Sequence, residues 1–168
     1  MGGEMDELYV LQWELAALFG ALECVEVTLE SGDVHGLRKE LTRLTALWRD
    51  VLGPQEDGVV LPKVRQSLAA VEPLLIANAV RRARLLGRLE TVDQYLAGGG
   101  FVARTRLARL LKPILTELRA QLTVEQQDVL PRLYAACSDE ERWELARDLD
   151  RCVDQLGRAR WEALLHDA

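Results

Sequence analysis

The sequence predicts an all-α fold, and three observations lead to this prediction. Hydrophobic residues make up 49% of the 168 residues but aromatic residues only 5%, so aliphatic side chains must fill the core. Leu, Ala, Glu and Arg are abundant and favour helices, and strand-like alternation never runs for long. Apolar residues recur three or four positions apart over most of the chain. We therefore expect a single domain over residues 1–168, built as an antiparallel four-helix bundle with an additional C-terminal helix.

The first two helices are predicted from leucine spacing and from turn residues. A helix over about residues 4–30 carries a stripe of leucines: Leu8, Leu11, Leu15, Leu18 and Leu22. The Ser31–Asp33 turn ends it, and Asp33 is a good N-cap for a second helix. Gly53 and Pro54 are expected to interrupt that second helix, and a shorter helical piece then runs to about residue 71.

Proline, glycine and a capping pattern divide the second half of the chain. Pro73 opens a third helix to about residue 96, and the glycine-rich stretch 97–100 is the clearest linker. A fourth helix over about residues 101–137 should kink at Pro113. Ser138 and Glu141 form a capping box for a last helix. The four tryptophans fall on apolar stripes and are expected in the core or in a cavity wall: Trp13, Trp48, Trp143 and Trp161.

Charge and cysteine content narrow the function classes. The net charge is −6, which disfavours general binding to nucleic acid, and no apolar run is long enough to span a membrane. The N-terminus lacks a basic-then-apolar leader, and three widely spaced cysteines (Cys24, Cys137, Cys152) indicate free thiols, so a cytoplasmic location is expected.

A cluster of arginines on the third predicted helix admits two interpretations. It is either a helix face paired with acidic neighbours or a docking patch for a protein partner. Its members are Arg81, Arg82, Arg84 and Arg88.

One nonapeptide pattern occurs twice, as EDGVVLPKV from Glu56 and as EQQDVLPRL from Glu125. On a helix, each glutamate shares a face with the valine four residues later, Val60 or Val129. Because that face also carries apolar residues that must enter the core, both glutamates are predicted to point into the bundle.

The repeated segments resemble the hemerythrin-like family of cation-binding four-helix bundles. Glu56-Asp57 with Val60-Leu61-Pro62, and Glu125-Gln126 with Val129-Leu130-Pro131, resemble the family's two Glu-to-Pro steps, and the resemblance covers roughly residues 8–150. It implies iron ligands made of histidines and carboxylates.

The histidine positions that this resemblance implies are not histidines in this chain. The two positions that lie four residues before the glutamates hold Leu52 and Gln121. The position on the first helix falls near Gln12, and the one on the third helix falls near Asn78 or Ala79. The two histidines of the chain, at positions 35 and 166, lie away from these positions. Iron in such a bundle needs imidazole and carboxylate ligands together, so we expect no metal and no cofactor.

Two interpretations remain for the space that a metal would fill, where Gln12, Glu56, Gln121 and Glu125 are expected to converge. One is a hydrogen-bonded polar plug. The other is a ligand cavity that Leu52 and Asn78 help to line. In the second case Glu56 and Glu125 are candidate acid and base, because burial without a nearby cation raises a carboxyl pKa.

The predicted function is therefore binding of a small, largely apolar organic molecule in the core of a metal-free bundle. Such a site also permits a cofactor-independent enzyme of the isomerase, lyase or cyclase type. The alternative is a non-catalytic scaffold or a regulatory protein-interaction module with a plugged metal site. An internal cavity that reaches solvent favours the first, and a filled core favours the second.

Overall fold

The computed structural model describes residues 8–67, 69–98 and 104–166, and every regular element in these ranges is helical. The all-α prediction is therefore confirmed for this part of the chain. None of the described helices is both long and apolar enough to cross a membrane. The predicted helix over residues 4–30 begins at Tyr9 in the structure, and its first positions lie outside the described residues, as do residues 99 and 100 of the predicted linker 97–100.

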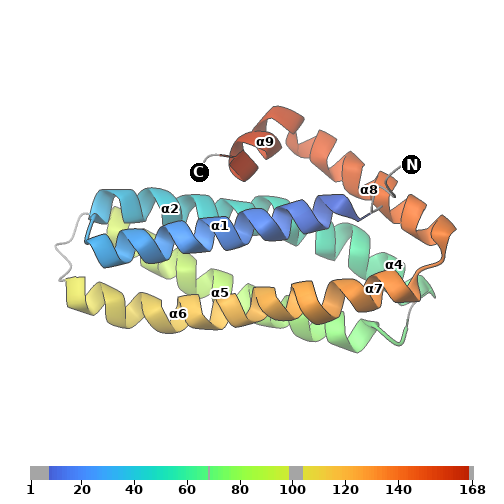
Figure 1. The fold of residues 1–168 in the computed structure, drawn as a ribbon, viewed down its shortest axis with the longest axis horizontal. Helices are drawn as coiled ribbons and strands as arrows, with labels where there is room; N and C mark the ends of the chain where they lie inside the picture. The colour runs from blue at the N-terminus through green and yellow to red at the C-terminus, as the bar shows by residue number, and fades with distance from the viewer. Residues whose placement is uncertain (1–7, 68, 99–103, 167–168) are drawn as a thin grey trace, which may run out of the picture.

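Four long helical segments lie side by side and run in alternating directions (Figure 1). The first is α1 (Tyr9–Ser31) and the third is α5 (Glu72–Ala97). The second and fourth each contain π-helical turns. The second consists of α2 (Val34–Ala46), η1 (Leu47–Leu52), α3 (Gly53–Gln55), η2 (Glu56–Val60) and α4 (Leu61–Ser67). The fourth consists of α6 (Arg104–Val124), η3 (Glu125–Val129) and α7 (Leu130–Ala136).

Each long segment packs against its two neighbours, so that the four enclose one core. That core is dominated by leucine, and its largest fully buried side chain is Trp48. Of the other tryptophans, Trp161 is buried, whereas Trp13 and Trp143 are exposed. The expectation that all four lie in the core or a cavity wall is wrong for Trp143, which lies on the outer face of its helix.

The turn signals act as predicted at two places. The Asp33 side chain accepts a hydrogen bond from the N–H of Gly36 and caps α2. Ser138 and Glu141 form a complete capping box at the start of α8 (Asp139–Leu156). These caps satisfy backbone N–H groups that have no partner inside the helix.

The Gly53–Pro54 step does not interrupt the second segment. The chain stays helical through it, with a π-helical turn before and another after the short α3. Pro54 has no N–H to donate, so one backbone hydrogen bond is missing inside this continuous helical path, and the π-helical turn directly before it leaves more room for the proline ring. The helical path then ends at Ser67, before the predicted end near residue 71.

Both copies of the repeated nonapeptide have the same backbone. The N–H of Leu61 donates to the carbonyl of Glu56, and the N–H of Leu130 donates to that of Glu125, which is the i→i−5 bond of a π-helix. Pro62 and Pro131 follow directly. A proline crowds the carbonyl four residues before it, and a wider turn ahead of it relieves that contact.

The last predicted helix is two helices in the structure. Gly157 ends α8 with a φ of 93°, a left-handed value that a residue with a side chain rarely adopts. The chain then turns into α9 (Arg158–His166), which packs against α1. Figure 1 shows α8 and α9 lying across one side of the bundle, over α1 and α2.

Candidate functional site

The third long segment, α5, contributes polar residues directly to the core. Its buried positions follow a spacing of three and four residues: Leu75, Asn78, Arg82, Leu85, Leu89, Val92 and Leu96. Asn78 and Arg82 therefore occupy two consecutive core positions between leucines. Of the two alternatives at the third histidine-like position, Asn78 faces the core, at 4% exposure, and Ala79 lies outside it.

Arg82 lies between the two repeated segments and is only 4% exposed. Its guanidinium forms an ion pair with Glu56, and its Nη2 lies 3.0 Å from Oδ1 of Asp57. The expectation that no cation lies near these glutamates is wrong. Burial lowers the pKa of Arg82 and the charge of Glu125 opposes this, but a guanidinium stays protonated at neutral pH.

Glu125 lies on the other side of the same cluster, at 2% exposure. Its Oε1 accepts hydrogen bonds from Nδ2 of Asn78 (2.8 Å) and Nε2 of Gln121 (3.0 Å), and Gln121 also donates to Asn78. Burial raises the pKa of Glu125, while these two bonds and the charge of Arg82 lower it in part. The raised direction agrees with the sequence-based expectation for a buried carboxyl.

The space beside these carboxylates is small. A cavity of about 20 Å³ borders Glu56, Glu125 and Leu52, among other residues. A cavity needs at least roughly 10–15 Å³ to hold one water molecule, so this one suits about one water and no organic ligand. Gln121, Glu125 and Asn78 form a hydrogen-bonded cluster beside this cavity, and Arg82 adds a charge to it. A polar plug was expected from Gln121 and Glu125 together with Gln12 and Glu56.

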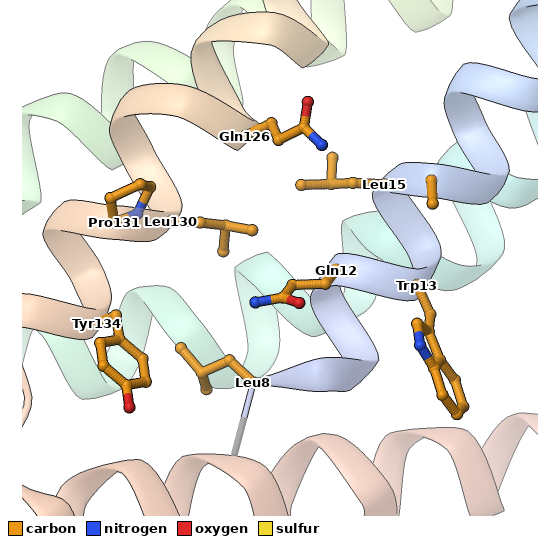
Figure 2. A pocket seen from close by; sticks show the side chains of 9 residues that line it. Leu8, Gln12, Trp13, Leu15, Gln126, Leu130, Pro131 and Tyr134 are labelled. Atoms are coloured by element: carbon orange, nitrogen blue, oxygen red, sulfur yellow. The ribbon is translucent and has the colours of Figure 1, made fainter. Parts of the chain in front are cut away.

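Gln12 does not join this cluster. It is exposed on α1, rotated by about 100° from the buried Leu11, because a helix advances by that angle per residue. Figure 2 shows its side chain extending into the space between α1 and α7, toward Leu130 and Leu8. Gln12 therefore lines a different, outer pocket, which we call the α1–α7 groove.

The α1–α7 groove has a volume of about 610 Å³. Four kinds of side chain line it: aliphatic groups, two amides, two aromatic rings and one proline. They are Leu8, Gln12, Trp13, Leu15, Ala16, Gln126, Leu130, Pro131 and Tyr134. Three of these residues belong to the second copy of the repeated nonapeptide: Gln126, Leu130 and Pro131. One face of that copy therefore packs into the core, and another face lines the groove.

Leu15 and Leu130 connect the two spaces. Both line the groove, and both also line the small cavity beside Glu56 and Glu125. The two leucines therefore form the wall between an open, largely apolar groove and the carboxylates of Glu56 and Glu125.

The arginine cluster of α5 is mostly paired with nearby side chains. Arg84 and Arg88 form ion pairs with Glu117, and Arg81 donates to Oε1 of Gln121. Arg82 is buried and does not belong to any surface patch. A protein partner for the remaining arginines stays a prediction.

The residues present do not fit a metal centre. Within the described residues, no group of three or more His, Cys, Asp and Glu side chains is placed to hold a metal ion. Glu56 pairs with the guanidinium of Arg82 instead, and Glu125 accepts hydrogen bonds from the amides of Asn78 and Gln121. Amides are weak ligands for iron or zinc.

We expect the purified protein to carry no stoichiometric iron, zinc or manganese. The physical reason is that Arg82 already supplies a positive charge to Glu56, which a divalent cation would have to displace. Elemental analysis after purification without chelators tests this. One or two ions per chain that disappear in Glu125→Ala would contradict it.

Comparison of the chain with protein-family models, curated proteins and solved structures finds no match.

Proposed function

We propose that the chain is a metal-free, hemerythrin-like bundle that binds a small, largely apolar organic molecule in the α1–α7 groove. The observation that carries this proposal is the difference between the two spaces. The groove, at about 610 Å³, falls within the usual range for ligand pockets, whereas the core cavity of about 20 Å³ has no room for an organic molecule. The order of the four long segments supports the hemerythrin-like part of the proposal.

The groove also indicates the chemical class of its ligand. None of the described residues that line it carries a formal charge. An ionised ligand would lose hydration there without gaining an ionic partner, so a neutral ligand is favoured. The amides of Gln12 and Gln126 and the ring of Tyr134 suit a molecule with one or two polar groups on an apolar body.

Catalysis by Glu56 or Glu125 stays a prediction. A ligand in the groove reaches these carboxylates only if Leu15 or Leu130 moves aside. The filled core favours the second candidate function, a non-catalytic interaction module whose former metal site is plugged by Arg82 and its neighbours.

We expect the neutral dye Nile red to bind the folded protein with enhanced fluorescence, and Ala16→Phe to weaken that binding at least about tenfold, or about 1.4 kcal/mol. Ala16 is exposed and lines the groove, so a phenyl ring there occupies ligand space without entering the core. Fluorescence titration measures the dissociation constant, and Trp13 in the groove wall should transfer energy to the bound dye.

Ala77→Phe is the matched control, because Ala77 is exposed on α5, away from the lining residues. Circular dichroism must show that both variants remain folded. Equal dye affinity in the two variants would show that the dye binds outside the groove. Absence of dye binding to the wild type would favour the interaction module.

A further inference from the structure

A second buried carboxyl lies on α1, one residue before Leu15 and therefore rotated by about 100° from the inner wall of the groove. This carboxyl belongs to Glu14, which is 1% exposed and lies outside the repeated segments. It belongs to a second buried stripe of α1, with Val10 and Ala21, which the C-terminal helices help to cover. A stripe of this kind is buried only because α1 has packed neighbours on two sides.

Glu14 joins three helices through one oxygen atom. Its Oε1 accepts a hydrogen bond from Nε2 of Gln55 in α3 (2.6 Å) and another from Nε1 of Trp161 in α9 (2.7 Å). Gln55 and Trp161 are themselves buried, at 2% and 4% exposure. The contact therefore ties the C-terminal helix to the bundle through a site that water does not reach.

Two acceptor atoms of this site have no hydrogen-bond partner within the described residues. They are the other carboxyl oxygen of Glu14, Oε2, and the amide oxygen of Gln55, Oε1. A buried acceptor without a donor has lost its contact with water and gained no partner, so two of them on neighbouring side chains are unfavourable. The same two side chains are already joined by the Nε2-to-Oε1 bond.

One proton satisfies this arrangement. A protonated carboxyl and a primary amide pair through two bonds in opposite directions: the amide N–H donates to the carboxyl C=O, and the carboxyl O–H donates to the amide C=O. The first bond is present here. A proton on Oε2 of Glu14 supplies the second donor, and Oε1 continues to accept from Trp161.

The charged groups around Glu14 are engaged elsewhere. From α8, Asp150 accepts from the hydroxyl of Tyr9 and lies 3.8 Å from Arg158 of α9. From η1, Asp50 pairs with Arg160 of α9, and Arg43 of α2 donates to the carbonyls of Leu164 and Leu165. The Cys152 thiol of α8 also interacts with Glu14, and its pKa is raised by burial and in part by the charge of Glu14. Glu162 and His166 of α9 are exposed.

We propose that Glu14 is protonated when α9 is docked, and that loss of this proton as the pH rises loosens α9 from α1. Glu14, Gln55 and Trp161 thus form a proton-dependent latch. The latch is independent of the proposed ligand.

The direction of the pH effect follows from burial. Burial raises the pKa of Glu14 from 4.5 to about 7, and the bonds from Trp161 and Gln55 lower it only in part. Docking of α9 therefore favours the protonated form. The latch is at full strength below about pH 4.5, weakens as the pH rises, and is lost above about pH 7. If release of α9 exposes Glu14, the opening equilibrium constant increases about tenfold per pH unit between about pH 5 and 7.

The first measurement is the indole ¹⁵N–¹H resonance of Trp161 between pH 5 and 8.5, assigned by its loss in Trp161→Phe. We expect it to shift with a midpoint near pH 7 in the wild type. In Glu14→Gln we expect no such shift, because the amide supplies a permanent donor and acceptor. Glu162→Gln makes the same chemical change at an exposed position of α9 and should behave like the wild type.

The second measurement is hydrogen exchange of the α9 backbone amides, expressed as protection relative to free peptide. Between pH 5 and 7 the protection should fall about tenfold per pH unit in the wild type and in Glu162→Gln, but should stay constant in Glu14→Gln. A pH-independent Trp161 resonance, or equal protection profiles in the wild type and Glu14→Gln, would overturn the proposal.

Discussion

Replacing Arg82 with methionine is expected to lower the free energy of unfolding by about 3–5 kcal/mol, which is the usual cost of removing one partner of a buried ion pair. Methionine retains much of the side-chain volume, so the loss reports mainly on charge. Without the guanidinium, Glu56 loses its ionic partner and Glu125 loses the positive charge that lowers its pKa. Urea denaturation followed by circular dichroism at pH 7 measures the change.

Arg84→Met is the matched control on the same helix. Arg84 is exposed and pairs with Glu117, and exposed pairs contribute about 0–1 kcal/mol. Lowering the pH to about 5 should recover part of the stability of Arg82→Met, because the carboxyls can then bind protons. A stability of Arg82→Met equal to that of Arg84→Met at pH 7 would show that the buried cluster does not depend on this charge.

The fold was largely predictable because its signals are local. Leucine spacing, the Asp33 cap and the Ser138–Glu141 capping box each act within one or two helical turns. The break at Gly157 was not predicted, because apolar spacing continues from α8 into α9 and one glycine within a helical pattern is often tolerated. The continuity through Gly53 and Pro54 depends on π-helical turns, which leave no strong sequence signal.

The site was only partly predictable because it depends on which helix faces which. The repeated pattern predicted that Glu56 and Glu125 point inward, and in the structure both border the same small cavity, with Glu125 buried and Glu56 partly buried. Arg82 was missed, although its position three residues before Leu85 and seven before Leu89 marks it as a core position. Its charge suggested a surface face, and charged residues at core positions are rare.

Glu14 illustrates a different limit. One leucine stripe on α1 was sufficient to predict the helix and one buried side. The second buried side exists because α8 and α9 fold back over α1, and this contact joins residues far apart in the sequence. The sequence alone predicts a solvent-exposed glutamate at this position, because it gives no indication that the C-terminal helices dock there.

The two glutamates of the repeat are expected to respond differently to the same substitution. Glu56→Gln should lower the free energy of unfolding by about 2 kcal/mol or more at pH 7, because it replaces the ionic partner of a buried guanidinium with a neutral amide. Asp57 remains in contact with Arg82 and limits the loss. Equilibrium unfolding at pH 7 measures both variants under the same conditions.

Glu125→Gln should change the free energy of unfolding by less than about 1 kcal/mol at pH 7, or increase it, because burial already disfavours the ionised form of Glu125. The glutamine oxygen can continue to accept from Asn78 and Gln121. Because the pKa of Glu125 is raised, its contribution to the stability of the wild type decreases as the pH rises. Glu125→Gln should therefore become more stable relative to the wild type toward alkaline pH. Equal losses in Glu56→Gln and Glu125→Gln would contradict the assignment of Glu56 as the principal partner of Arg82.

Nile red affinity should be unchanged in both variants, since neither residue lines the groove. A folded Glu125→Gln protein that no longer binds the dye would instead connect the groove to the core carboxylates through Leu15 and Leu130, and would favour the catalytic interpretation.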